Sequence, residues 1–83
     1  ALLGAGNSAY ALGQLDAAAR AYRHATQVHP DHADAWNNLA QVLYEQAQYS
    51  QALQAAQRAV AQGGARVDRY RELETRIQSK IGR

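Results

Sequence analysis

The chain has 83 residues, which is enough for one small domain with one modest hydrophobic core. Apolar residues make up 47% of it, 19 of them alanine, and the absence of Cys excludes disulfides and thiolate chemistry. The formal net charge is +2, and no run of 18 apolar residues occurs, so we expect no membrane insertion. An alanine-rich core needs backbones that approach closely, which favours packed helices over a β-sandwich.

Four turn signals divide the chain: Gly13-Gln14, His29-Pro30-Asp31, Ala47-Gln48 and Gly63-Gly64. Between them, apolar residues recur at the three- and four-residue spacing of an amphipathic helix. The sequence therefore predicts five helices, in chain order, at about residues 1–12, 15–28, 32–46, 49–62 and 66–81.

Single residues support these bounds and faces. Asp31 is expected to cap the third helix by accepting from the backbone N–H of Asp34, whose own carboxylate favours the first turn. Gly63-Gly64 supplies the left-handed residue that ends the fourth helix. Trp36 lies on the apolar face of the third helix, so we expect it to be a core residue.

The chain repeats itself with a period of 34 residues. Identical residues recur at this spacing in six pairs: Ala1/Ala35, Tyr10/Tyr44, Gln14/Gln48, Ala18/Ala52, Ala21/Ala55 and Ala25/Ala59. Small residues also match, since Gly6 corresponds to Ala40. This period is typical of paired helices that stack in an array.

On these residues the chain resembles the tetratricopeptide repeat (TPR) family. The signature positions of the second unit hold Trp36, Leu39, Ala40, Leu43, Ala47, Tyr49, Ala52, Ala56 and Ala59. Those of the first unit hold Leu2, Gly6, Gly13, Leu15, Ala18, Tyr22, Ala25 and Pro30. The last segment is similar to the family's terminal capping helix, with Tyr70, Leu73 and Ile77 in the packing positions.

The resemblance implies an all-α fold, a right-handed solenoid of two helix-turn-helix repeats closed by a C-terminal helix. One domain spans residues 1–83, divided into a first repeat at 1–32 that is truncated at its N-terminus, a second repeat at 33–66 and a capping helix at 67–83. It also implies a non-enzymatic scaffold that binds a peptide or a partner protein through its concave groove. We expect it to be one part of a larger bacterial protein.

In this family the first helix of each unit lines the inner groove, so the site is expected on side chains that packing leaves free there. These candidate groove residues are Asn7, Tyr10, Asp34, Asn37, Asn38, Gln41, Tyr44 and Glu45, together with Arg71 from the predicted capping helix. Amides both donate and accept hydrogen bonds, which suits a peptide backbone, and tyrosines offer flat amphipathic contacts. A polar face that is simply solvated remains the alternative.

Other kinds of site have little support in the sequence. No phosphate-binding glycine loop or nucleophile motif occurs, so we expect no enzyme and no cofactor. The His29–Asp34 segment holds potential metal ligands, but a solvated loop and a helix start account for them, so we expect no metal. Residues 66–83 carry six basic and three acidic side chains in alternation, as on a solvated helix, so we expect no nucleic-acid partner.

Two further interpretations stay open. The chain could be a structural segment that forms a homodimer through an apolar N-terminal edge made by Leu2, Leu3 and Tyr22. Residues 32–81, through the run AVAQGGARVDRYRE, also resemble the repeat segment attached to bacterial C39-like cysteine peptidases, which implies an accessory domain of a larger enzyme. The sequence leaves the partner and the compartment, cytoplasmic or periplasmic, undecided.

Overall fold

The structure is a computed structural model that describes residues 2–82, apart from the side chain of Leu2. Five α-helices account for most of these residues: α1 (Leu2–Ala11), α2 (Leu15–Val28), α3 (Ala33–Glu45), α4 (Tyr49–Gln62) and α5 (Val67–Ile81). The five predicted helices are confirmed to within about a residue at each end, and no strand occurs in the described part. Ala1 lies outside the described residues.

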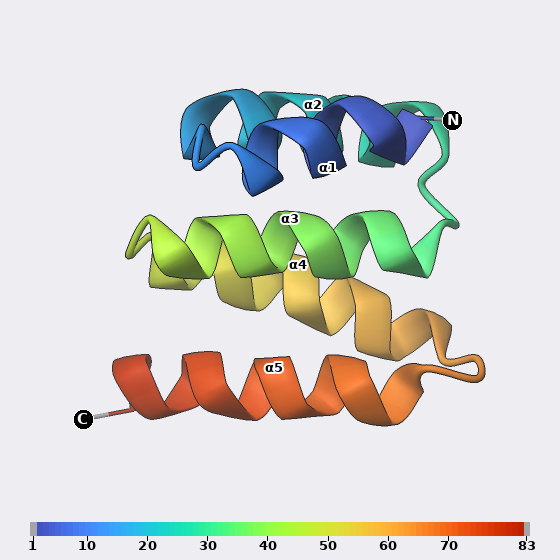
Figure 1. Ribbon diagram of the computed structural model, residues 1–83. Coiled ribbons are helices and arrows are strands. Elements are labelled where there is room, and N and C mark those ends of the chain that lie inside the picture. The colour runs from blue at the N-terminus through green and yellow to red at the C-terminus, as the bar shows by residue number, and fades with distance from the viewer. Residues whose placement is uncertain (1, 83) are drawn as a thin grey trace.

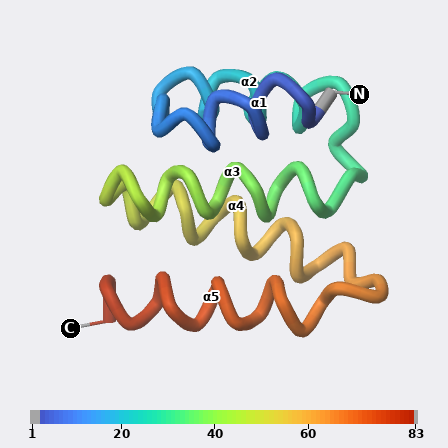
Figure 2. Tube along the Cα trace, viewed as in Figure 1, coloured from blue at the N-terminus to red at the C-terminus, as the bar shows by residue number. Residues whose placement is uncertain are grey.

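The helices form two antiparallel pairs and a closing helix (Figure 1). α1 pairs with α2 and α3 pairs with α4, while α5 packs on α4 and also touches α3. The colour gradient along the trace shows the chain advancing from one pair to the next, with the two ends of the chain at opposite ends of the stack (Figure 2). α3 is the central helix, because it contacts α2, α4 and α5.

α1 and α3 end in the same way. The N–H of Gln14 donates to the carbonyl oxygen of Ala9 at 2.9 Å, and the N–H of Gln48 donates to that of Leu43 at 2.9 Å, as in a Schellman motif. The motif needs a left-handed residue, which is Gly13 (φ 76°) in the first unit and Ala47 (φ 62°) in the second. The second unit therefore places a side chain in a conformation that favours glycine.

The first unit is held by a close approach of its two helices. A Cβ atom added to Gly6 would lie 2.4 Å from Cε1 of Tyr22, so α1 crosses the ring of Tyr22 where only glycine leaves room. Tyr22 is 3% exposed and belongs to the core. The small residue expected at this position is thus explained by a specific ring, and Tyr22 is not part of an exposed edge as the sequence analysis expected.

The second unit has a core of small and aliphatic side chains. Its buried residues on α3 and α4 are Ala35, Leu39, Ala40, Val42, Leu43, Ala52, Ala55, Ala56 and Ala59. α5 contributes Tyr70, Leu73 and Ile77, and the burial of all three confirms the packing predicted for the last helix. α3 is buried on two sides because α2 covers one and α4 and α5 cover the other.

The start of α3 differs from the prediction in two ways. Its N-cap is His32, with no side-chain cap, so the prediction that Asp31 caps this helix is wrong. Trp36 is half-buried at the edge of the core: its Nε1 donates to the carbonyl oxygen of Pro30 at 2.8 Å, and the Arg58 guanidinium lies 4.5 Å above its ring. The ring stays at the edge because these two polar contacts hold it there.

Candidate functional site

The candidate site is built on α1 and α3, the first helices of the two units. Figure 1 shows them lying in front of α2 and α4. We call the surface formed by Asn7, Tyr10, Asn37, Asn38, Gln41, Tyr44 and Glu45 the α1/α3 face. These residues follow the three- and four-residue spacing of one helix side because the opposite side of each helix is used for packing.

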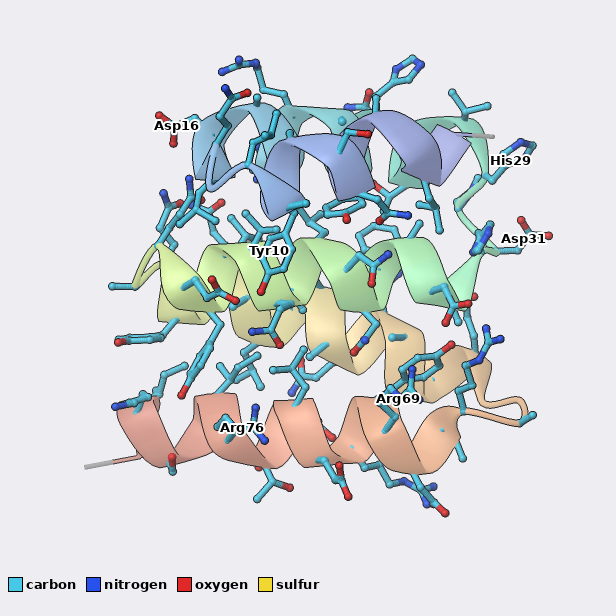
Figure 3. The ribbon with its side chains drawn as sticks, in the orientation of Figure 1. Tyr10, Asp16, His29, Asp31, Arg69 and Arg76 are labelled. Atoms are coloured by element: carbon cyan, nitrogen blue, oxygen red, sulfur yellow. The ribbon has the colours of Figure 1, made fainter. Side chains whose placement is uncertain are left out.

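Three predicted site residues form one hydrogen-bonded cluster across the two units. The hydroxyl of Tyr10 on α1 donates to Oε2 of Glu45 on α3, and Nε2 of Gln41 donates to the same oxygen at 2.8 Å. Tyr10 is labelled in Figure 3, where its side chain extends from α1 toward α3. The hydrogen bond to Glu45 and the partial burial of the ring raise the pKa of Tyr10, because both favour the neutral phenol.

Asn7 is committed in part to the core. Its Oδ1 accepts a hydrogen bond from the hydroxyl of the buried Tyr22 at 2.5 Å. Burial raises the pKa of Tyr22, since a phenolate would be poorly solvated there. The side chain of Asn7 is still exposed, so it contributes to the α1/α3 face while fixing Tyr22.

Asn37 and Asn38 lie near the middle of α3 and Tyr44 lies near its C-terminal end, and all three are partly buried. Oδ1 of Asn37 is buried and has no hydrogen-bond partner among the described residues. The ring of Tyr44 packs against that of Tyr49 with centroids 5.9 Å apart.

Asp34 has a different role from the one expected. Its Oδ1 accepts from the hydroxyl of Tyr70 at 2.5 Å, and its Oδ2 pairs with the guanidinium of Arg66. Burial and this hydrogen bond raise the pKa of Tyr70. The carboxylate therefore fastens the start of α5 to α3 and its charge is compensated by Arg66, and the sequence pattern indicated neither partner.

Arg71 stands apart from the other candidates. It pairs with Asp68 of the same helix at 3.9 Å and lines a hollow on α5 with Glu72, Thr75 and Arg76. Figure 3 labels Arg69 and Arg76 on this helix as well. The structure thus joins Tyr10, Gln41 and Glu45 by hydrogen bonds, whereas the ion pair of Arg71 is with Asp68 on its own helix.

The histidine-rich loop joins α2 to α3 at the side of the stack (Figure 3). His29, His32 and Arg66 line a hollow where the α2–α3 loop meets the α4–α5 loop. Within residues 2–82, no group of three or more histidines and carboxylates is arranged to hold a metal ion. No helix in the same range is both long enough and apolar enough to cross a membrane.

Comparison with family models identifies the repeats. A family model described as tetratricopeptide repeat matches residues 3–66, well over half of the chain, and these residues are the two helix pairs. No curated protein matches the sequence. The expected link to a cysteine peptidase therefore stays a prediction.

Proposed function

Because the chain belongs to the tetratricopeptide repeat family, whose repeats are generally protein–protein interaction modules, we propose that it binds an extended or helical peptide of a partner protein on the α1/α3 face. It acts as a scaffold and catalyses no reaction. The residues of this face lie outside the hydrophobic core or at its margin. Packing of the core therefore does not account for them.

The observation that carries the proposal is the group of amide side chains on this face. Asn37, Asn38 and Gln41 lie on the same side of α3, and all three residues are partly exposed. A peptide backbone offers one donor and one acceptor per residue, which amide side chains match. Tyr10, which is 37% exposed, adds an aromatic contact beside them.

The test is an NMR titration in which a library of short peptides is added to the isolated chain and the changes in its amide chemical shifts are recorded. We expect perturbed amides to cluster on Asn38, Gln41 and Tyr44. Asn38→Ala should weaken binding, whereas Gln54→Ala, which removes an exposed amide from α4, should not. Perturbations gathered instead on α2 and α4 would show that the binding surface has been assigned to the wrong helices.

A second candidate function is self-association through the outer edge of the first unit. Leu12 is 73% exposed and Val28 is 48% exposed, whereas Leu3 packs against the core. Leu12 stands one repeat before Gln46, whose Nε2 donates to Asp16 of α2 at 2.6 Å. In the second unit this position contacts α2 of the first unit, whereas in the first unit Leu12 is exposed.

Sedimentation equilibrium over a range of concentrations tests this second candidate. We expect a weak dimer that Leu12→Glu abolishes, because a carboxylate would have to be buried in the contact. Ile81→Glu is the matched control, since Ile81 is also an exposed aliphatic residue but lies on α5. A monomeric wild type, or a dimer unaffected by Leu12→Glu, would rule the candidate out.

A further inference from the structure

We propose that the cluster of Tyr10, Gln41 and Glu45, here called the Glu45 subsite, takes a cationic side chain, Lys or Arg, of the bound peptide. This inference rests on the proposed function and specifies its ligand. The neighbouring amides bind the peptide backbone whatever side chains the peptide carries. The carboxylate of Glu45 therefore determines which peptides bind most tightly.

The first support is the free half of the carboxylate. Both hydrogen bonds to Glu45, from Tyr10 and from Gln41, go to Oε2, and none of the described residues donates to Oε1. A carboxylate oxygen accepts about two hydrogen bonds, so Glu45 keeps unused acceptor capacity. Its side chain is exposed, which leaves Oε1 open to a ligand.

The second support is the charge balance of the two helices. α1 carries no charged residue, and α3 carries only Asp34 and Glu45. Arg66 neutralises Asp34, whereas Glu45 forms no ion pair with any described Lys or Arg. Glu45 is therefore the one uncompensated carboxylate on α1 and α3, and it repels an anionic side chain while attracting a cationic one.

The third support is the fixed position of this carboxylate. Two hydrogen bonds from two different helices hold Glu45, so its charge is not spread over many rotamers as on an ordinary surface glutamate. The partly exposed ring of Tyr10 lies beside it, and an aromatic face also attracts a cation. An apolar ligand residue would gain neither contact and would strip water from Oε1.

The experiment compares four pools of short peptides with acetylated and amidated ends. Their central residue is Lys, Arg, norleucine or Glu, and all other positions are mixtures of uncharged residues. We expect the Lys and Arg pools to bind about three- to tenfold more tightly than the norleucine pool, and the Glu pool to bind least. The preference should shrink at high salt.

Glu45→Gln is the decisive variant, because it removes the charge but keeps an oxygen that can accept from Tyr10. It should bind the Lys and norleucine pools equally, while Asp31→Asn, which removes an exposed carboxylate from the α2–α3 loop, should keep the wild-type preference. Chemical-shift changes on the α1/α3 face without any preference for Lys or Arg would overturn this inference but not the proposed function. A preference that persists in Glu45→Gln would do the same. An absence of any shift on α1 and α3 with all four pools would overturn the proposed function itself.

Discussion

Gly6 and Gly4 stand two residues apart on α1 and face different surroundings. A Cβ atom on Gly6 would collide with the ring of Tyr22, whereas a Cβ atom on Gly4 would meet no atom within 4 Å. The same substitution should therefore act in opposite directions at the two sites. Alanine removes backbone freedom from the unfolded chain at both, but only at Gly6 does it force two helices apart.

We predict that Gly6→Ala lowers the free energy of unfolding by about 1–3 kcal/mol, the usual cost of overpacking. Gly4→Ala should raise it by up to about 1 kcal/mol through helix propensity. Urea unfolding followed by circular dichroism measures both. If the two variants had the same effect, the contact between Gly6 and Tyr22 could not be what closes the first unit.

Ala47 gives a second prediction at the same scale, because it holds φ 62° where the first unit has Gly13. Ala47→Gly should stabilise the chain by about 0.5–1 kcal/mol by relieving the left-handed strain. Gly13→Ala should destabilise it by a similar amount. Thermal unfolding of the two single variants checks this pair, and a destabilised Ala47→Gly protein would contradict it.

At the scale of the helices, the bond between Asp34 and Tyr70 joins α3 to the closing helix. Tyr70 is buried and its pKa is raised above the ordinary value near 10, so folding favours its neutral phenol. A raised pKa gives stability that is fully present below the unfolded value and is lost as the pH rises through the folded value. The attachment of α5 should therefore weaken in alkaline solution.

We predict that the free energy of unfolding of the wild type falls above about pH 10 and that Tyr70→Phe reduces the fall, because phenylalanine has no proton to lose. Tyr49→Phe is the control, since it keeps the contact with the ring of Tyr44 and removes a hydroxyl that donates no hydrogen bond to any described residue. Urea titrations at neutral and alkaline pH provide the measurement. An equal fall in wild type and Tyr70→Phe would place the alkaline sensitivity elsewhere.

How far the sequence predicts these elements depends on whether the cause is local. The helix bounds followed from periodicity and turn residues, because each helix is fixed by neighbours along the chain. The bond from Tyr70 to Asp34 joins residues 36 positions apart, and no local pattern indicates it. Trp36 was expected in the core because it lies on the apolar face of its helix, but its contacts with Pro30 and Arg58 hold it at the edge.

The candidate site shows the same division. Tyr10, Gln41 and Glu45 were predicted on one surface because the repeat places equivalent helices side by side, and the structure joins them. Asp34 shares their face in the sequence pattern, but Arg66 occupies it. Contacts between helices decide which carboxylate forms an ion pair and which does not. The pattern of one helical face therefore could not show that Asp34 and Glu45 differ in this respect.

For the whole molecule, the order of the helices in the stack sets how stability is distributed. α3 contacts α2, α4 and α5, whereas α1 lies at the outside and packs mainly on α2. Only Gly6 and Ala9 are buried among the described residues of α1. Elements with few buried contacts open at lower free energy than the centre of a domain.

We predict that the slowest amide hydrogens of α1 exchange with solvent at least about tenfold faster than those of α3. This factor corresponds to a difference of about 1.4 kcal/mol in the free energy of local opening between the two helices. Hydrogen exchange followed by NMR resolves the two helices separately. Equal protection of α1 and α3 would mean that the stack opens only as one unit. The comparison uses two helices of similar length within one molecule, so solution conditions cancel.

The hydrogen bond from Tyr10 to Glu45 spans the joint between the two units, and this has a mechanical consequence. Each unit of such a stack contacts only its neighbours, so a change in the angle between two units is resisted by the contacts at their joint. Tension that opens this angle parts the hydroxyl from the carboxylate and dismantles the cluster. A ligand that contacts both units on the α1/α3 face resists the same opening. Tension on the chain and binding of this ligand are therefore coupled through the angle between the two units.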